Sequence, residues 1–283
     1  MPPRLKKFLR KEPILGLSGK VCVVTGASSG IGRRTSLDLA AAGAEVCVAA
    51  RREERLRALV AEMGGGERGH TYLATDVSDR AQVKRLALHV RERYGRCDVL
   101  VNNAGISGRA TFGPDTIDDL EQLMRVNFFG AVYCTGEFLD LLTLSAPSNV
   151  VNVASVAGRL APPGFSSYTA SKFALVGWTE SLQPEMARKE IYVSSIEPGF
   201  VATEGFPQDD LVDDPVLKRV LGTEAQVSAA IRHAIEHRKR QRVVPRFYYL
   251  PLIPKVLTPR AFRFVFERIL GPRSARRAAE SED

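Results

Sequence analysis

Short apolar runs alternate with segments of helical spacing along the first 200 residues of the chain. The runs are rich in β-branched residues, and several end in glycine or in a polar turn. They cover residues 20–26, 44–51, 70–76, 97–105, 148–155 and 191–199. The runs are apolar throughout rather than alternating, which is typical of strands that are covered on both faces.

The segments between these runs carry apolar residues at the spacing of an amphipathic helix. They include residues 33–43, 52–65, 80–95 and 118–142, and a further helix contains Tyr168. Strands that are separated by helices pair in parallel through right-handed crossovers. The pattern therefore predicts an α/β fold in three layers, with a doubly wound, mostly parallel sheet between helices. Ligands of such a sheet bind beyond the carboxyl ends of its strands.

The length of the chain, 283 residues, allows one large domain with a sizeable core. We expect this domain at residues 18–245, with a last short strand at 242–245. A basic leader at 1–17 precedes the domain. We expect residues 246–283 to form a basic, amphipathic extension with a disordered end.

The positive charge of the chain is concentrated at its two ends. The formal net charge is +8, and residues 232–283 hold 13 Lys or Arg against 5 Asp or Glu. The body, residues 21–231, holds 21 Lys or Arg against 26 Asp or Glu. Basic ends on an acidic body indicate contact with an anionic surface at the ends.

The extension contains a segment, 259–270, with helical spacing. Its apolar face holds Phe262, Val265, Phe266 and Ile269, and its arginines lie largely on the other face. One interpretation is that this face packs on the body or on a second subunit. The other is peripheral contact with a membrane interface or a lipid-like substrate. A nucleic-acid arm is disfavoured, because such arms usually stay polar.

The chain carries no apolar run of the length that a membrane-spanning helix or a signal peptide needs. Its four cysteines form no CxxC pair, and we interpret them as buried reduced thiols of a cytosolic protein. Its four histidines fit no zinc pattern, so we expect no metal site. These observations predict a cytoplasmic location, with association with the inner face of the membrane as an alternative.

A glycine-rich turn, "TGASSGIG" at 25–32, joins the first predicted strand to the first predicted helix. Gly26 permits a tight turn, Gly30 lets the backbone approach a phosphate, and Gly32 lets the helix pack close to the sheet. The amino terminus of the helix then offers N–H groups and a partial positive charge to a pyrophosphate. The turn predicts a dinucleotide-binding site.

The residues after the second strand indicate which dinucleotide binds. Sites selective for NAD usually place an acidic residue here for the ribose 2′-hydroxyl, whereas a 2′-phosphate favours arginine. Here the strand ends in "VAARR", so Arg51 and Arg52 favour NADP(H) over NAD(H). The alternative is a solvated start of the second helix. Asp76, at the end of the third strand, is placed to touch the adenine amino group.

Six motifs together resemble the short-chain dehydrogenase/reductase family. They are "TGASSGIG", "NNAG" at 102–105, Asn127 in "VNFFG", Ser155, "YTASK" at 168–172 and "PGFVAT" at 198–203. Their order and spacing are similar to the single-domain branch of the family with the TGxxxGxG and YxxxK motifs, and the resemblance covers about 18–245. It implies a Rossmann fold and an oxidoreductase that is a homodimer or homotetramer. One departure is Glu197, where "NPG" is more usual than "EPG".

The resemblance implies four catalytic residues, Asn127, Ser155, Tyr168 and Lys172. Lys172 lies one helical turn after Tyr168, so its ammonium would lower the pKa of the phenol. Tyr168 would then give a proton to a carbonyl oxygen, or take one in the reverse direction. Ser155 would hydrogen-bond the substrate oxygen, and Asn127 would hold a water that relays protons to Lys172.

The same resemblance implies a cofactor site along the ends of the strands. Together with the residues above, its members are Gly26, Ser28, Ser29, Gly30, Ile31, Arg51, Arg52, Asp76, Val77, Asn103, Ala104, Gly105, Tyr168, Lys172, Pro198, Gly199, Val201 and Thr203. Residues 204–222 stand where the family keeps a substrate lid, and they mix large apolar residues with aspartates.

These observations predict a ketoreductase-type enzyme that transfers a hydride between NADP(H) and a carbonyl or secondary alcohol. The apolar character of the lid and of the extension predicts a hydrophobic or lipid-like substrate. The alternative is a non-catalytic dinucleotide-binding protein with a regulatory or scaffold role. Such a protein would lose part of the Ser155, Tyr168 and Lys172 set, which is complete here.

Overall fold

A computed structural model describes residues 16–108, 112–204, 221–265 and 268. Its centre is one seven-stranded sheet with the order β3-β2-β1-β4-β5-β6-β7, and every pair of neighbours is parallel. The strands are β1 (Val21–Thr25), β2 (Glu45–Ala50), β3 (Thr71–Ala74), β4 (Val99–Asn102), β5 (Ser148–Val153), β6 (Ile191–Pro198) and β7 (Gln241–Val244). The predicted parallel sheet is confirmed.

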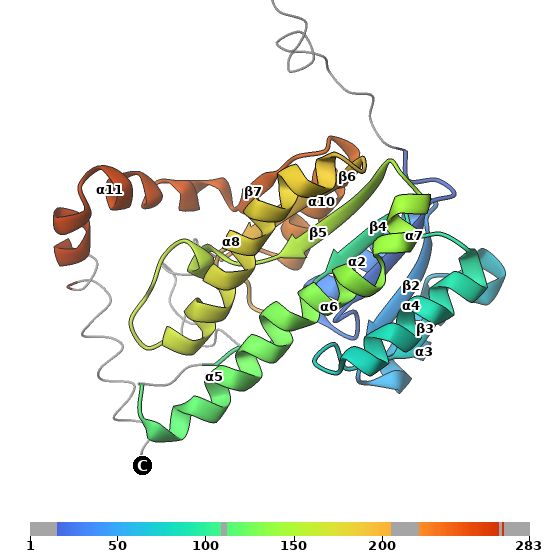
Figure 1. The fold of residues 1–283 in the computed structure, drawn as a ribbon, viewed down its shortest axis with the longest axis horizontal. Helices are drawn as coiled ribbons and strands as arrows, with labels where there is room; N and C mark the ends of the chain where they lie inside the picture. The colour runs from blue at the N-terminus through green and yellow to red at the C-terminus, as the bar shows by residue number, and fades with distance from the viewer. Residues whose placement is uncertain (1–15, 109–111, 205–220, 266–267, 269–283) are drawn as a thin grey trace, which may run out of the picture.

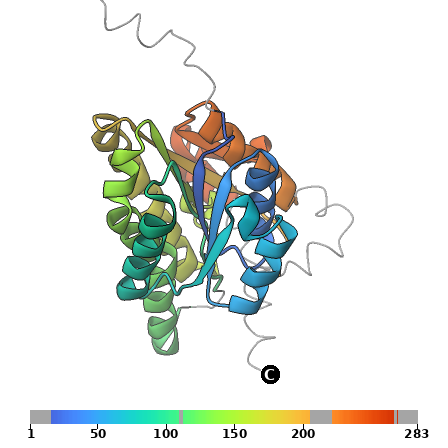
Figure 2. The ribbon, with the colours of Figure 1, turned by 90° about the vertical axis from the view of Figure 1, so that its right-hand side faces the viewer.

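Helices cover both faces of the sheet and complete the three predicted layers (Figures 1 and 2). One face is covered by α2 (Gly30–Ala41), α3 (Glu53–Glu62) and α10 (Glu224–Glu236). The other face is covered by α4 (Arg80–Tyr94), α6 (Gly130–Glu137), α7 (Leu139–Leu144) and α8 (Ser166–Ala187). In Figure 2 the strands run between these two groups of helices.

The two-sided core follows from the period of two along each strand. In β1, Cys22 and Val24 join the cluster under α2, whereas Val21 and Val23 join the cluster under α4. The four cysteines are free and buried, as the sequence predicted. Burial raises the pKa of Cys47 to about 12, so its thiol stays protonated.

The last crossover corrects one expectation. From β4 to β7 each strand is added on the same side of the one before it. The connections β4–α6–β5 and β5–α8–β6 run along one face of the sheet. The helix α10, which connects β6 to β7, lies on the opposite face. The β6–α10–β7 connection is therefore left-handed, and the prediction of right-handed crossovers is wrong for it. On this face α10 packs against α2, where Ser228 donates a hydrogen bond to Asp38 at 2.6 Å.

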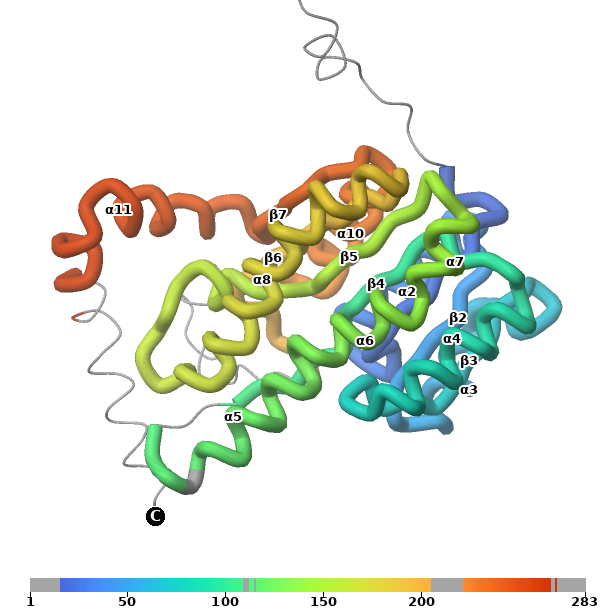
Figure 3. Tube along the Cα trace, in the orientation of Figure 1, coloured from blue at the N-terminus to red at the C-terminus, as the bar shows by residue number. Residues whose placement is uncertain are grey.

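The segment predicted as one helix over 118–142 is interrupted. It begins as α5 (Ile117–Met124), continues as a π-helix at Arg125–Phe129 and resumes as α6. Figure 3 traces these pieces as one continuous rod. The Gly130 N–H donates to the carbonyl of Arg125, five residues earlier, which is the π pattern. Asn127 lies inside this wider turn.

The extension after β7 contains a short 3₁₀ turn at Arg246–Tyr249, then α11 (Leu252–Leu257) and a helical segment at 259–265. In Figure 1 the extension runs away from the sheet as an arm. Among the residues that the structure describes, no helix is long and apolar enough to cross a membrane. The predictions for most of the leader, the lid and the chain end fall on 1–15, 205–220 and 269–283, outside the described residues.

Candidate active site

The glycine-rich turn lies between β1 and α2 and has the backbone that only glycine adopts readily. Gly26 and Gly30 have φ values of 66° and 59°. A side chain at Gly26 would place its Cβ 2.7 Å from the Cα of Ala104. Asn103 supports the turn, because its Nδ2 donates to the carbonyl of Thr25 at 3.0 Å. The turn is therefore shaped by contact with the end of β4.

The amino terminus of α2 is open to an anion. Ser29 is the N-cap residue, but its side chain makes no capping hydrogen bond. The first N–H groups of the helix therefore have no side-chain partner at the cap, as a pyrophosphate site requires.

A cavity of about 400 Å³ opens beyond the carboxyl ends of the strands, next to this turn. The structure brings most of the sequence-predicted residues to its walls. These are Gly26, Ser29, Gly30, Ile31, Asn103, Gly105, Ser155, Tyr168, Lys172, Pro198, Gly199, Val201 and Thr203. They lie in α2 and α8 and at the carboxyl ends of β1, β4, β5 and β6, so distant parts of the chain meet at one site.

Tyr168 and Ser155 face each other in this cavity. Ser155 follows β5 and is the N-cap of a 3₁₀ turn at Val156–Gly158, where its Oγ accepts a hydrogen bond from Ala157 N at 3.0 Å. The Ser155 hydroxyl is hydrogen-bonded to the side chain of Tyr168, which lowers the phenol pKa, but burial is the larger effect and raises the pKa of Tyr168 to about 12.

Lys172 lies one turn along α8 from Tyr168, as predicted. Its Nζ donates to the carbonyl of Val153 at 3.1 Å and lies 5.8 Å from the centre of the Tyr168 ring. Burial lowers the pKa of Lys172 to about 8. Near neutral pH, Lys172 therefore keeps most of its charge, but it is easily neutralised above that value.

The expected fall of the Tyr168 pKa is absent from this structure. The Lys172 ammonium sits over the ring and is held by Val153, whereas the whole phenol group is removed from water. Desolvation of the phenolate therefore outweighs the attraction of the ammonium. A phenol in this setting stays protonated at neutral pH and is suited to donating a proton.

The side chain of Asn127 is hydrogen-bonded within the protein. Its Oδ1 accepts from Ile106 N at 2.8 Å, and its Nδ2 donates to the Ile106 carbonyl and to Ser171 Oγ, both at 3.0 Å. The side chain therefore joins the loop after β4 to α8, beside Lys172. Both amide protons are used within the protein, so the side chain helps to position the loop, and its predicted part in holding a water stays a prediction.

A second cavity of about 350 Å³ adjoins the glycine turn and is lined by Ser28, Ser29, Arg33 and Arg55 among others. Arg52 donates to the hydroxyls of Ser28 and Ser29 at 3.0 and 2.9 Å. The predicted Arg52 thus reaches the phosphate-binding turn.

Glu204 balances the charge of this second cavity. Its carboxylate accepts from Arg55 at 2.7 Å and also pairs with Arg52. These two arginines hold the pKa of Glu204 below its ordinary value. Sequence reasoning missed Arg55, although it follows Arg52 by three residues in the segment predicted as a helix over 52–65, which puts the two side chains on the same face.

Seven predicted residues do not line the main cavity: Asn127, Ser28 and Arg52, described above, and Arg51, Ala104, Asp76 and Val77. Arg51 is exposed at the end of β2, and Ala104 packs against the glycine turn. The Asp76 carboxylate accepts two hydrogen bonds from Ser78, at 2.9 and 2.7 Å. Val77 is buried against Gly130. Their roles in cofactor binding remain predictions.

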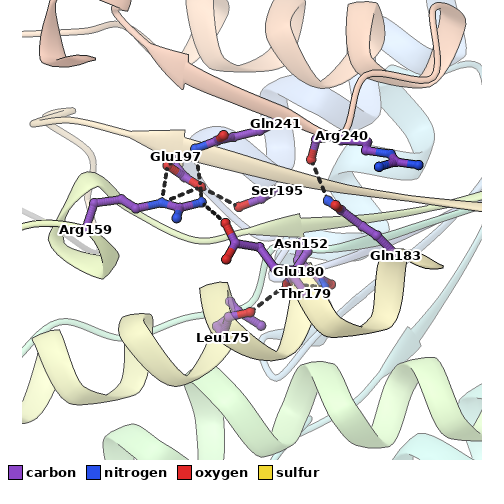
Figure 4. Close-up of polar contacts among 10 residues, drawn as sticks. All are labelled: Asn152, Arg159, Leu175, Thr179, Glu180, Gln183, Ser195, Glu197, Arg240 and Gln241. Carbon is purple, nitrogen blue, oxygen red and sulfur yellow. Dashed lines mark hydrogen bonds and ion pairs between the residues drawn. The ribbon is translucent and has the colours of Figure 1, made fainter. Parts of the chain in front are cut away.

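Glu197, the departure from the usual "NPG", is fully buried and holds the site together (Figure 4). Arg159 binds its carboxylate through Nη2 at 2.9 Å and Nε at 3.1 Å. Ser195 and Gln241 donate to the same carboxylate, each at 2.9 Å. Arg159 also pairs with Glu180 of α8. This ion pair connects the turn after Ser155 to the "PGF" corner.

The extension supplies part of the cavity wall, which sequence reasoning did not foresee. Tyr248 and Pro251 line the cavity, and a Cβ on Gly199 would lie 2.1 Å from the Tyr248 ring. Lys255 of α11 donates to the carbonyl of Arg159. The 3₁₀ turn at Arg246–Tyr249 and α11 therefore pack against the segment that follows Ser155.

Comparisons with known proteins agree with this geometry. The family model described as short chain dehydrogenase matches residues 20–210. The chain is 37% identical over 187 residues to the 3-oxoacyl-[acyl-carrier-protein] reductase FabG of Thermotoga maritima, covering 66% of this chain and 76% of that protein. It is 34% identical over 204 residues to dehydrogenase/reductase SDR family member 7B of mouse, covering 71% of this chain and 62% of that protein.

A solved structure extends the likeness to the whole fold. A short-chain dehydrogenase/reductase of Burkholderia phymatum, in complex with NAD, matches with a TM-score of 0.77 and 27% identity, covering 86% of this chain and 94% of that one. A parallel sheet with a glycine turn and a Ser–Tyr–Lys site defines an NAD(P)-binding oxidoreductase of the Rossmann type. The chain belongs to the short-chain dehydrogenase/reductase family.

Proposed function

We propose that this enzyme reduces a carbonyl group of a hydrophobic substrate with NADPH, and that Ser155, Tyr168 and Lys172 carry the chemistry. The observation that carries the proposal is the meeting of these three side chains at one cavity beside the glycine turn. A complete catalytic set distinguishes this function from a regulatory or scaffold role. The protonated form of Tyr168 is the one that can give a proton to a carbonyl oxygen.

The site residues fit a nicotinamide dinucleotide. The positive φ values and the close approach of Ala104 exclude side chains at the glycine turn, and the uncapped start of α2 faces the same space. Ser29, Gly30 and the first N–H groups of α2 would hold the pyrophosphate. Arg52 and Arg55 would hold a 2′-phosphate, which supports NADP(H) over NAD(H).

The chemistry divides between cofactor and protein. When bound, the reduced nicotinamide supplies a hydride. Ser155 donates a hydrogen bond to the carbonyl oxygen of the substrate and stabilises its developing negative charge. Tyr168 transfers its phenolic proton to that oxygen. Lys172 then stabilises the phenolate by its charge and orients the ribose by its ammonium.

The cavity wall supports a hydrophobic substrate. Its lining includes Leu160, Pro162, Phe165, Phe200 and Tyr248. These side chains offer few hydrogen bonds, so they favour an aliphatic or lipid-like carbonyl over a polar one.

The partners and location belong to the same proposal. We expect a homodimer or homotetramer formed through the long helices, because Phe129 is partly exposed and stacks on Tyr133 there. Four buried free thiols are typical of a cytoplasmic protein. The extension would contact a membrane surface, since it combines exposed apolar side chains with arginines.

A screen of ketones tests the reaction. Aliphatic, steroid and acyl ketones are offered with NADPH or NADH, and cofactor oxidation is followed by absorbance. We expect turnover with NADPH on apolar ketones, and a loss of about 100-fold or more in Tyr168→Phe with cofactor binding retained. Full turnover by Tyr168→Phe would refute the proposed acid.

Cofactor titration tests the NADP(H) preference separately. Arg52→Ala with Arg55→Ala is expected to weaken NADPH binding about tenfold or more and to leave NADH binding nearly unchanged. Arg57→Ala is the matched control, because Arg57 of the same helix pairs with Glu53 and Tyr72 instead. Tighter binding of NADH than of NADPH by the native chain would overturn the preference.

A further inference from the structure

The helix α11 has its polar and apolar sides reversed relative to an ordinary surface helix. Its outward residues are Ile253, Val256 and Leu257, with exposed fractions of 55%, 77% and 74%. Its lysine faces inward: Lys255 donates to the Arg159 carbonyl and lies over the ring of Phe173 at 5.1 Å. A helix that turns its cation toward the body and its aliphatic side chains toward the outside is not arranged for water.

The neighbouring segments continue this exposed apolar surface. Leu250 precedes α11 with an exposed fraction of 66%, and Phe264 and Val265 in the helical segment 259–265 are also exposed. Phe262 of that segment turns inward and packs with the cluster around Leu160. We name the six exposed residues the α11 surface: Leu250, Ile253, Val256, Leu257, Phe264 and Val265.

The charged side chains of residues 237–265, the segment that carries the α11 surface, are all of one sign. Residues 237–265 contain no Asp or Glu, and exposed Arg246, Arg260 and Arg263 accompany the apolar side chains. A second copy of the chain would bring the same cations together, which is unfavourable. An anionic bilayer complements both features, because its interior accepts aliphatic side chains and its headgroups attract arginine.

The α11 surface begins at the rim of the catalytic cavity. Pro251, the N-cap of α11, and Tyr248 line the cavity, and Leu250 lies between them in sequence with its side chain exposed. A bilayer in contact with Leu250 and Ile253 would therefore lie beside the apolar side of the cavity. The cavity wall and the docking surface are parts of one continuous apolar region.

We infer that the α11 surface docks on an anionic lipid bilayer and that the enzyme takes its carbonyl substrate from the membrane rather than from water. The substrate part of this inference rests on the proposed function, whereas the docking part does not. Arg246, Arg260 and Arg263 contact the headgroups, and the aliphatic residues enter the interface. Substrate then passes along the apolar wall to Ser155.

Sedimentation with vesicles tests the docking. The full chain is mixed with vesicles of phosphatidylcholine alone or with a quarter of phosphatidylglycerol, at about physiological ionic strength. We expect binding to the anionic vesicles. Ile253→Ser, Val256→Ser and Leu257→Ser together should weaken it at least about tenfold. Each of Arg260→Ser and Arg263→Ser should weaken it about fivefold.

Matched controls separate docking from general stickiness. Leu88→Ser with Leu144→Ser replaces exposed leucines on α4 and α7, away from the extension, and should leave vesicle binding unchanged. Equal vesicle binding by the native chain and the triple serine variant would overturn the inference. The binding would then have to come from another part of the chain, such as the basic leader. Light scattering gives the other contrary outcome: a dimer that the triple variant dissociates, without vesicle binding, would make this surface a subunit interface.

The readouts keep this inference distinct from the proposed function. Vesicle binding requires no turnover, so a chain that docks but reduces no ketone would refute the proposed function alone. Membrane delivery alone would be refuted if vesicles did not change the rate at which apolar ketones are reduced, and if the native chain and the triple variant had the same rate. We expect a long-chain ketone embedded in anionic vesicles to be reduced several-fold more slowly by the triple variant.

Discussion

Removal of Arg159 tests the buried ion pair most directly. In Arg159→Leu, the fully buried Glu197 loses the guanidinium whose Nη2 and Nε lie 2.9 and 3.1 Å from its oxygens. Charge-assisted hydrogen bonds contribute about 1.5–3 kcal/mol each, and breaking a buried pair costs about 3–5 kcal/mol. Glu197 keeps its bonds from Ser195 and Gln241, so we expect about 3 kcal/mol.

The assay is urea unfolding, followed by circular dichroism, in a double-mutant cycle. Glu197→Gln in the Arg159→Leu background removes the stranded charge and should recover about half of the lost free energy of unfolding. Arg125→Leu is the control, because Arg125 pairs with Glu121 at an exposed site and should change stability by less than about 0.5 kcal/mol. Equal effects of Arg159→Leu and Arg125→Leu, or no recovery in the double variant, would refute the reasoning.

Three further predictions follow from the site. Burial lowers the pKa of Lys172 from 10.5 to about 8, so between these values the unfolded chain binds more protons. The free energy of unfolding of the native chain should therefore rise from about pH 8 to 10.5 relative to Lys172→Met, as urea titrations at both ends can show. Glu204→Gln removes the carboxylate that competes for Arg52, and should tighten NADPH binding several-fold in a fluorescence titration without affecting NADH; equal changes for both would contradict this. Gly199→Ala places a methyl against the Tyr248 ring and should raise the KM for substrate several-fold, whereas Gly136→Ala, with open space around it, should have no such effect.

The placement of the site residues was predictable because it is encoded locally. A strand that ends in a glycine turn and begins a helix needs only neighbouring residues, and the spacing of Tyr168 and Lys172 places both on one helical face. The order of strands along the chain then brought Ser155 to the same edge of the sheet, since parallel strands end together. These features depend on periodicity and on topology, which the sequence displays directly.

The features that sequence reasoning missed depend on contacts between distant segments. Tyr248, which follows β7 in the sequence, packs on Gly199, which follows β6. Glu204 pairs with Arg52, which is 152 residues away in the sequence. No local pattern distinguishes such partners from solvated side chains. The phenol pKa of Tyr168 was predicted in the wrong direction for a related reason: helical spacing gives the position of Lys172 but not the depth of burial, and burial decides the shift.

Because of the π-helix around Asn127, the number of residues in this segment decides the direction of the following helix as much as their identity does. An α-helix rotates by about 100° per residue, so shortening the Arg125–Phe129 segment by one residue would turn everything after it by that angle. Ala131 and Cys134, which are now buried, would swing toward solvent. A relative that kept every named side chain but lacked this single insertion would have a differently aimed helix and an unbraced loop beside its lysine.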